Sequence, residues 1–310
     1  MKKITSLAVC LILCFAFTAC TNNQNKGSDG KEGYPITDIR IFKGTPAWEL
    51  AKAIESQKID KIEEIVKDKL DVLNYQDSEY GATLLLWSIG MEKYESAEML
   101  LKCGADPDIA AIQDGETPLF LASGYSWVDN VAKKDSKYVK LLLEYGADPD
   151  TSYIGYSNPE YKGAIEKGTT ALMNSIGTGI EKTKALVEAG ADINVKCKSE
   201  STAAISALRH SQNPEYAHYL IAEKKAIINE SYYSSIVLKG DDPNKEFYAV
   251  DILRKWVFEL GSEKHKMKME IVEEFERQGV DYWGTAIPDR TLKKIKKLYP
   301  DTWEEVILKY

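Results

Sequence analysis

The sequence predicts an all-α protein built as a solenoid of stacked helix pairs. The tripeptide Gly-Ala-Asp occurs three times, at 104–106, 146–148 and 190–192. Each copy follows an apolar helical stripe, such as 141–143, and its glycine can adopt the left-handed conformation that ends a helix. A threonine opens a short apolar run before each of these stripes and in two further places. These threonines are Thr45, Thr83, Thr117, Thr170 and Thr202.

The third unit shows most clearly how a helix pair begins. Thr117 can accept a backbone N–H at a helix start, and Pro118 suits the first turn, where its missing donor costs nothing. The run from Thr117 to Ala122 (Thr-Pro-Leu-Phe-Leu-Ala) resembles the ankyrin repeat, whose mark is Thr-Pro-Leu-His-x-Ala at a period of about 33 residues. Phe120 stands where that family usually has histidine. The resemblance implies stacked helix–turn–helix units joined by hairpin connections over residues 41–284.

The two ends of the solenoid must differ from its middle, because a terminal unit has only one neighbour to cover it. The first unit fits this role with a charged second helix at 61–67. At the other end, 246–260 and 264–278 form a longer, atypical helix pair. Residues 285–310 read as a final amphipathic helical cap, and we expect the aromatic side chains there to pack in its core.

Two insertions interrupt the repeat. The first insertion (residues 124–135) lengthens the turn between the helices of the third unit, and the second insertion (residues 151–167) lengthens the connection that leaves it. Long loops inside compact domains are often functional, and aromatic side chains are favoured at interfaces. The alternative is that these rings pack over the edge of the solenoid. The aromatic residues concerned are Tyr125, Trp127, Tyr153, Tyr156 and Tyr161.

Residues 1–19 are predicted to be a signal peptide. Lys2 and Lys3 precede an apolar run at 7–17, which is shorter than the ~20 residues of a membrane-spanning helix. The run ends in Phe-Thr-Ala-Cys, which is similar to the bacterial lipobox, a site cleaved just before a cysteine. The resemblance implies acylation of Cys20, with residues 20–40 holding the lipidated cysteine and a flexible tether. A plain signal peptide is the alternative.

The lipobox resemblance also implies a place in the cell envelope, with the solenoid in the periplasm or at the cell surface. The outer membrane is favoured over the inner membrane, because Thr21 stands where an aspartate would favour retention. Loss of Lys2 and Lys3 with the signal leaves 38 basic and 48 acidic residues, a net charge of −10. An acidic chain of this kind has no general reason to bind nucleic acid.

The sequence contains no recognisable catalytic or metal-binding constellation. No carboxylate or cysteine pattern completes a metal site around the histidines, which are His210, His218 and His265. Several aspartates occupy the loop position of the repeat, where such side chains bond to nearby backbone. These are Asp106, Asp108, Asp148, Asp150 and Asp192. We therefore expect no catalytic residue, metal or cofactor, and an enzyme with a scattered site is the weakest alternative.

The function that the sequence favours is a membrane-anchored module that binds a partner protein. The ankyrin resemblance implies recognition through hairpin tips and the exposed side of each first helix, by a chain that we expect to be monomeric. We expect the partner to present a basic face. An immunity lipoprotein that neutralises a periplasmic toxin, such as a phospholipase effector, is the alternative, since some ankyrin-type lipoproteins act in this way. Carried over by position, the binding residues are Glu79, Tyr80, Ala82, Gly90, Met91, Gln113, Asp114, Glu116, Gly124 and Tyr125.

Overall fold

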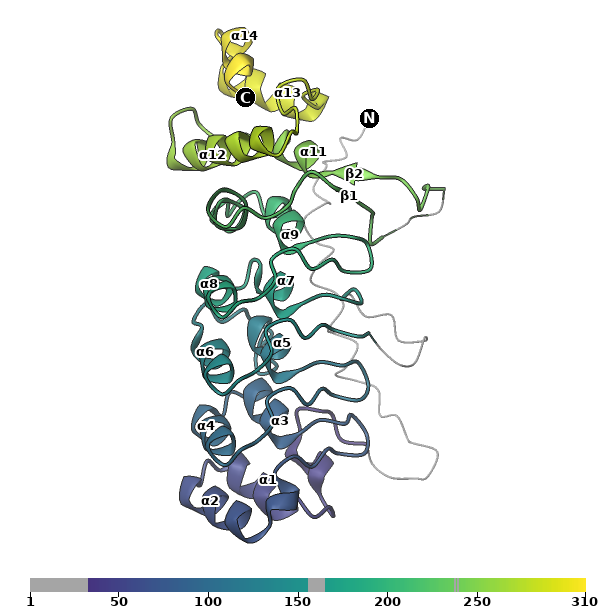
Figure 1. Cartoon of the computed structure of the whole chain (residues 1–310), viewed down its shortest axis with the longest axis vertical. Coiled ribbons are helices and arrows are strands. Elements are labelled where there is room, and N and C mark those ends of the chain that lie inside the picture. Colours follow the sequence, from purple (N-terminus) through teal and green to yellow (C-terminus); the bar gives the residue numbers. More distant parts are fainter. Residues whose placement is uncertain (1–32, 156–164, 237, 239) are drawn as a thin grey trace, which may run out of the picture.

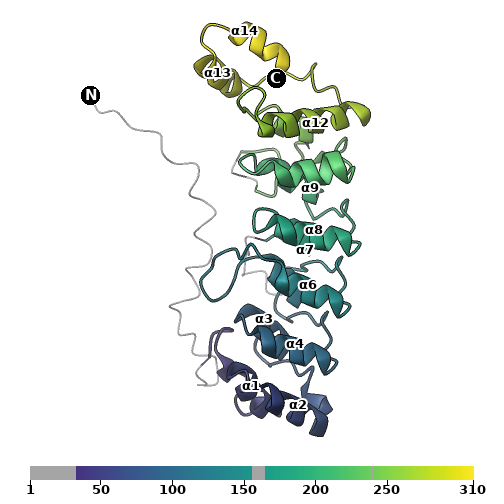
Figure 2. The same ribbon diagram turned by 90° about the vertical axis from the view of Figure 1, so that its left-hand side faces the viewer.

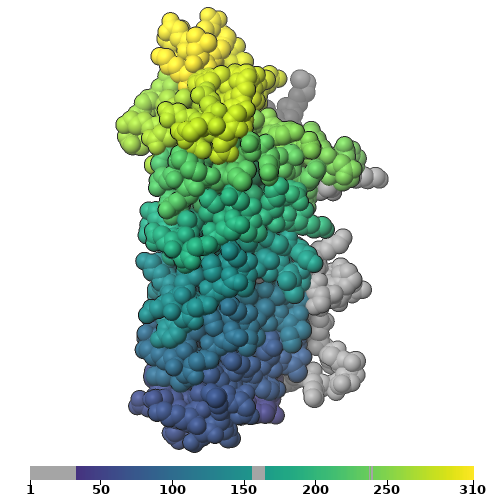
Figure 3. Space-filling view, in the orientation of Figure 1, coloured from purple at the N-terminus to yellow at the C-terminus, as the bar shows by residue number. Residues whose placement is uncertain are grey.

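The computed structural model describes residues 33–155, 165–236, 238 and 240–310. In this part of the chain, helix pairs stack along one long axis (Figure 1). The first helices of the pairs form a central column, the second helices a column to the left, and the connections between pairs project to the right. Figure 2 shows the second helices side by side from another direction. In Figure 3 the colours follow one another along the axis, because consecutive units are neighbours in space.

Six helix pairs can be numbered as units in the described residues. They are α1 (Trp48–Glu55) with α2 (Ile59–Asp68), α3 (Leu84–Gly90) with α4 (Tyr94–Lys102), α5 (Pro118–Ser123) with α6 (Lys137–Glu144), α7 (Ala171–Ser175) with α8 (Ile180–Glu188), α9 (Ala203–Arg209) with α10 (Glu215–Ala217) and the π-helix η3 (His218–Glu223), and α11 (Ala249–Leu253) with α12 (Glu263–Arg277).

Shorter elements flank and interrupt these units. They are η1 (Ile39–Phe42), η2 (Leu70–Val72), α13 (Asp289–Leu298), α14 (Trp303–Val306) and η4 (Ile307–Lys309). A two-stranded antiparallel sheet pairs β1 (Ser231–Tyr232) with β2 (Phe247–Tyr248). The predicted predominance of helix is confirmed. No helix within the described residues has both the length and the apolar character needed to cross a membrane.

The threonines that open the repeats cap the first helices of their units. The Thr117 hydroxyl accepts the N–H of Phe120 at 3.2 Å, and Pro118 occupies the first turn of α5, as predicted. Thr83, Thr170 and Thr202 cap α3, α7 and α9 in the same way. Thr45 differs, because its hydroxyl donates to the Phe42 carbonyl at 2.7 Å and α1 begins only at Trp48. The first unit therefore departs from the pattern at its very start.

A residue in the left-handed conformation follows the second helix of each central unit. Gly104, Gly146 and Gly190 have φ angles of +92°, +86° and +99°. The N–H of the alanine after each glycine then donates, at 3.0 Å, to a carbonyl in the last turn of the helix. In the fifth unit Lys225 occupies the position of this glycine with a φ of +63°, which is uncommon for a residue other than glycine. The predicted helix ends are confirmed.

Aspartates in the connections link each unit to the next by hydrogen bonds. The Asp148 N–H donates to Asp108 Oδ1 at 3.0 Å, and the Asp192 N–H donates to Asp150 Oδ1 at 2.8 Å. The same bond joins Asp106 to Asn74 and Ile227 to Asn194. These side chains thus satisfy backbone donors, as predicted, and they do so across units as well as within them.

Stacking of the first helices builds the main core. Helix α3 packs against α5, and α5 packs against α7. Leu84, Leu119 and Leu172, one from each of these helices, are fully buried or nearly so. At the start of the stack, Ile39 is buried against the same core. The folded part therefore begins slightly earlier than the predicted tether boundary at residue 40, because Ile39 has apolar surface that α1 covers.

A separate small core holds the end of the stack together. Ile295, Val306 and Tyr310 are buried in it, which agrees with the packing role expected for residues 285–310. The Tyr310 carbonyl oxygen accepts hydrogen bonds from Arg254 and from the hydroxyl of Tyr282, and both donors are buried. Arg254 lies between α11 and α12, and Tyr282 follows α12. The cap is therefore fixed to the sixth unit by hydrogen bonds as well as by packing.

We predict that Leu142→Ala destabilises the protein by about 2–5 kcal/mol, because this α6 leucine is fully buried and its truncation leaves a cavity. Leu298→Ala, on the exposed face of α13, is the matched control and should change stability by less than about 0.5 kcal/mol. Urea unfolding followed by circular dichroism measures both variants. Equal stability of the two variants would show that α6 does not face the core.

Candidate functional site

The hairpin connections carry an exposed apolar residue close to their tips. Ile112 and Ile154 are 65% and 57% exposed, and each lies directly over a glycine of the preceding connection. A Cβ built on Gly81 would overlap Ile112, and one on Gly115 would overlap Ile154. Both glycines also have positive φ angles, so no other residue fits there without strain. The close approach sets neighbouring connections side by side and leaves their isoleucines facing solvent.

Two of the predicted binding residues form hydrogen bonds, Tyr80 to the segment before η1 and Gln113 to the preceding connection. The Tyr80 hydroxyl donates to the Tyr34 carbonyl at 2.9 Å, and the Gln113 side chain donates to the Glu79 carbonyl at 3.0 Å. Met91, at the end of α3, is half-buried against the main core. The structure therefore gives all three residues a packing or bonding role within the stack.

Two acidic residues of the predicted surface have shifted pKa values. Asp114 accepts the N–H of Glu116 at 3.0 Å, and burial raises the pKa of its carboxyl group. Burial, with a smaller contribution from the charge of Asp114, raises the pKa of Glu116 to about 8. At neutral pH Glu116 is therefore mainly protonated, so it adds less negative charge to this surface than the sequence predicts.

The first insertion folds back on its own chain and packs along the stack. The Ser126 N–H donates to the Val131 carbonyl at 3.2 Å, which closes a short loop. In Figure 2 this loop is the teal segment to the left of α6. The Trp127 ring lies on Gly90 of α3, where a Cβ would overlap it. Trp127 is thus half-buried against the second unit and is not a free surface anchor.

Polar contacts tie the same insertion to its neighbours on both sides. Ser126 donates to Glu92, and Lys133 forms an ion pair with Glu92 at 3.3 Å, so both reach the second unit. In the fourth unit, Lys182 donates to the carbonyl of Gly124 at 3.3 Å. A Cβ on Gly179 would also overlap the backbone of the insertion. The insertion therefore spans three units at the ends of their helices and braces them.

Three large side chains of this braced loop face solvent. Tyr125 and Val128 are each 55% exposed, and Val131 is 53% exposed. Tyr125 was predicted as a binding residue, whereas the two valines were not. The predicted hot spots were aromatic, and a pair of valines in a polar loop gives no comparable signal. The exposed apolar surface therefore lies on the predicted loop but on partly different residues.

The second insertion differs from the prediction at Tyr153. This ring is only 3% exposed and stacks on Phe120, with 5.5 Å between the ring centroids and 23° between the ring planes. Tyr153 therefore cannot act as an exposed anchor. The contact also gives Phe120 a partner at the position where the ankyrin pattern has histidine. Tyr156 and Tyr161 lie outside the described residues, as does Cys20.

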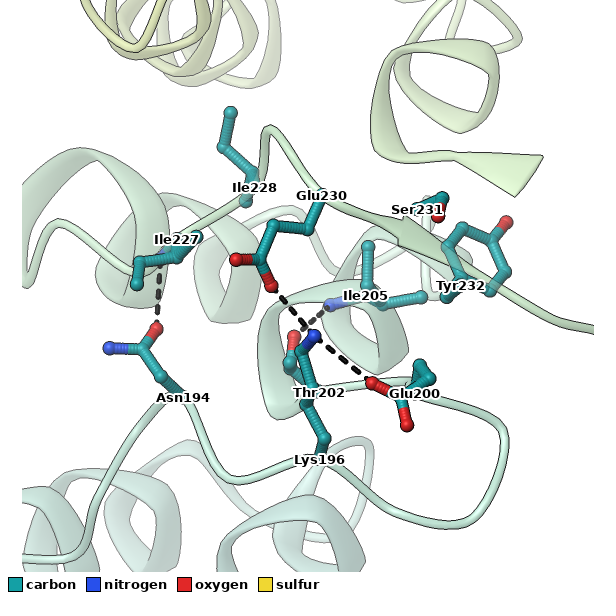
Figure 4. A pocket seen from close by; sticks show the side chains of 10 residues that line it. All are labelled: Asn194, Lys196, Glu200, Thr202, Ile205, Ile227, Ile228, Glu230, Ser231 and Tyr232. Carbon is teal, nitrogen blue, oxygen red and sulfur yellow. Dashed lines mark hydrogen bonds and ion pairs between the residues drawn. The ribbon is translucent and has the colours of Figure 1, made fainter. Parts of the chain in front are cut away.

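One pocket lies between the connection that follows α8 and the connection that follows η3 (Figure 4). Lys196 lines it and forms ion pairs with Glu200 at 3.0 Å and with Glu230 at 2.7 Å. In the same pocket Asn194 Oδ1 accepts the Ile227 N–H at 2.8 Å. The only cation that lines this pocket within the described residues is thus paired with two carboxylates, so the pocket offers no unpaired cation to a ligand.

No three side chains of His, Cys, Asp or Glu within the described ranges are grouped so that they could hold a metal ion. The sequence analysis did not single out Lys182, which is a buried cation. Lys182 is 3% exposed and lies on the stripe of α8 that also buries Ala185 and Leu186. A lysine at helical spacing from such residues is a signal that could have revealed it.

An ankyrin-repeat model matches residues 114–152. The match spans α5, the first insertion and α6, which form the unit whose capping threonine and closing glycine are described above. It supports an ankyrin-repeat protein, and such repeats generally act as non-catalytic modules of protein–protein interaction. No curated protein matches the chain.

We predict that Trp127→Ala destabilises the protein by about 2 kcal/mol, because the ring covers the second unit at Gly90. Tyr125→Ala, in the same loop, should cost less than about 0.5 kcal/mol because that ring is mostly exposed. Urea unfolding compares the two variants. If they lose the same stability, Trp127 does not brace the second unit.

The raised pKa of Glu116 predicts a pH dependence of stability. Folding holds the proton more tightly than the unfolded chain does, so this contribution is complete below pH 4.5 and is lost as the pH rises to about 8. Glu116→Gln, which imitates the protonated group, should be more stable than the wild type at pH 8 and nearly equal to it at pH 4.5. Urea unfolding at several pH values measures the difference, and parallel pH profiles would contradict the shift.

Proposed function

We propose that this chain is a lipid-anchored module of the bacterial cell envelope that binds a partner protein through an ankyrin-type solenoid. The observation that carries the proposal is the first insertion, which is fixed to three units while it exposes Tyr125, Val128 and Val131. Contiguous exposed apolar side chains on a soluble protein often mark an interaction site. A loop that is already held in place loses little conformational entropy when a partner binds.

The exposed isoleucines of the hairpin connections form a second candidate surface, on another side of the stack. Ile112 and Ile154 stand on neighbouring connections, and each is mostly solvent-exposed although its backbone is held by a close contact. The acidic net charge of the mature chain favours a partner with a basic face, because complementary charge speeds encounter at low salt. An interaction module agrees with the ankyrin match better than an enzyme does.

Anchoring rests on the sequence around Cys20. An apolar run that ends in Phe-Thr-Ala-Cys supports cleavage after Ala19 and acylation of the cysteine. Two or more acyl chains hold a protein stably on a membrane, since each buried CH₂ contributes ~0.8 kcal/mol. The residues between Cys20 and the first unit would then separate the stack from the lipid surface, with the outer membrane as the favoured location.

We predict that Cys20→Ser abolishes lipid attachment and releases the protein from the membrane fraction. Metabolic labelling with an alkyne fatty acid, followed by fractionation of the bacterial envelope, measures both effects. Cys103→Ser is the matched control, since this half-buried thiol lies in the fold and should leave labelling unchanged. Equal label in the wild type and in Cys20→Ser would contradict the lipidation proposal.

The binding surface is tested with a double substitution, Tyr125→Ala with Val131→Ala. After a partner has been isolated with Cys20→Ser protein and purified, its affinity for the variant should fall by about 2 kcal/mol, roughly 30-fold. Unfolding stability should stay within about 0.5 kcal/mol of the parent, because both side chains are exposed. Leu298→Ala, which is exposed on the cap, is the control. Unchanged affinity of the double variant would place the binding surface elsewhere.

A further inference from the structure

A second pocket lies beneath the first insertion, on the side of the stack away from the hairpin connections. Its cavity volume is about 70 Å³, several times the volume that one water molecule needs. The walls come from the insertion and from helices of the second, third and fourth units. Its lining residues are Ile89, Gly90, Glu92, Leu121, Ala122, Gly124, Tyr125, Ser126, Lys133, Asp135, Lys137, Tyr138 and Lys182.

Two polar groups at this pocket have unused hydrogen-bonding capacity. Lys182 is almost fully buried, and its ammonium group makes one hydrogen bond, to the Gly124 carbonyl at 3.3 Å. An ammonium group has three donors, so two are left over. The hydroxyl of Tyr138 is buried and has no hydrogen-bond partner within the described residues. Buried polar groups are normally paired, and both of these residues line the same pocket.

Lys182 is the buried cation of this pocket, and it forms no ion pair within the described residues. Lys133 is paired with Asp129 at 2.5 Å and with Glu92 at 3.3 Å. Burial lowers the pKa of Lys182 to about 8, although the charge of Asp135 opposes this shift, so Lys182 is mainly charged at pH 7. The unpaired ammonium group of Lys182 fits a ligand with a single negative charge.

We propose that this pocket binds the carboxylate of a small monoanionic ligand. The carboxylate oxygens accept hydrogen bonds from the Lys182 ammonium and the Tyr138 hydroxyl, which are the donors left without sufficient partners. The carbon part of the ligand lies against the apolar side of the pocket, formed by Ile89, Leu121 and Ala122. A free short-chain acid and the side chain of a glutamate on another protein present this same group. The proposal does not depend on the protein-binding function.

Free butanoate and a glutamate capped at both ends (N-acetyl-glutamate N-methylamide) are the probes for the test. Each is titrated at pH 7 and constant ionic strength into residues 20–310 carrying Cys20→Ser, and the amide signals of Gly124 and Lys182 are followed by NMR. The expected result is a saturable shift of both signals. Tighter binding of butanoate indicates a free acid as the ligand, and tighter binding of capped glutamate indicates a protein side chain. Absence of a saturable shift with both probes overturns the proposal.

Variants identify the donors. Lys182→Met should weaken binding at least tenfold, and Tyr138→Phe, which removes only the hydroxyl, should weaken it several-fold. Lys184→Met is the matched control, because Lys184 is exposed on the same helix and pairs with Glu181 at 3.4 Å. Its affinity should stay within twofold of the parent. Equal affinity of the parent and Lys182→Met overturns the proposal, and Tyr138→Phe keeps the test valid if Lys182→Met fails to fold.

The ligand class has two further tests. Affinity should fall as the pH rises above 8, where Lys182 loses its proton in a pocket shared with Lys133, Asp135, Lys137 and Glu92. Inorganic phosphate at the same ionic strength should bind more weakly than butanoate, since among the described residues the pocket has a single buried cation without an ion pair, Lys182, and an apolar wall. Phosphate binding as tightly as butanoate, or affinity that is unchanged between pH 7 and pH 9.5, overturns the assignment of a carboxylate.

Discussion

Every helix pair in this chain leaves an apolar face that only the next pair can cover. Leu119 of α5 is fully buried because α3 and α7 lie on either side of it. The dependence is polar as well as apolar, since the N–H groups of Asp148 and Asp192 find their acceptors on the preceding connection. Stability in such a stack is carried by interfaces between neighbours more than by any single unit.

The surface and the pocket that we propose to bind ligands both lie where the regular pattern is interrupted. The first insertion replaces a short turn with a loop that carries Trp127 onto the second unit and meets Lys182 of the fourth. A loop fixed at both sides can display Tyr125 outward while it roofs a pocket beneath. One insertion thus carries exposed apolar side chains and also lines a pocket of mixed polar and apolar character.

The features that could be predicted from the sequence are those fixed by short-range geometry. A threonine that caps the helix following it and a glycine that ends the helix preceding it act within a few residues, so their patterns were sufficient to place α5 and α6. The burial of Tyr153 depends on Phe120, which belongs to α5, and the burial of Trp127 depends on Gly90 in another unit. No local pattern records such pairings, so the sequence left open which loop aromatics pack and which face solvent. The exposed valines carried no comparable signal.

The insertion also changes how the stack should open. A regular repeat array can lose its units one at a time, since each contributes its own interface and can fray independently from an end. Here contacts from one loop to the second unit through Glu92 and to the fourth through Lys182 mean that neither can separate without disturbing the third. We therefore expect the second to fourth units to open as a single cooperative block, whose amide hydrogens exchange together and more slowly than those of the first unit.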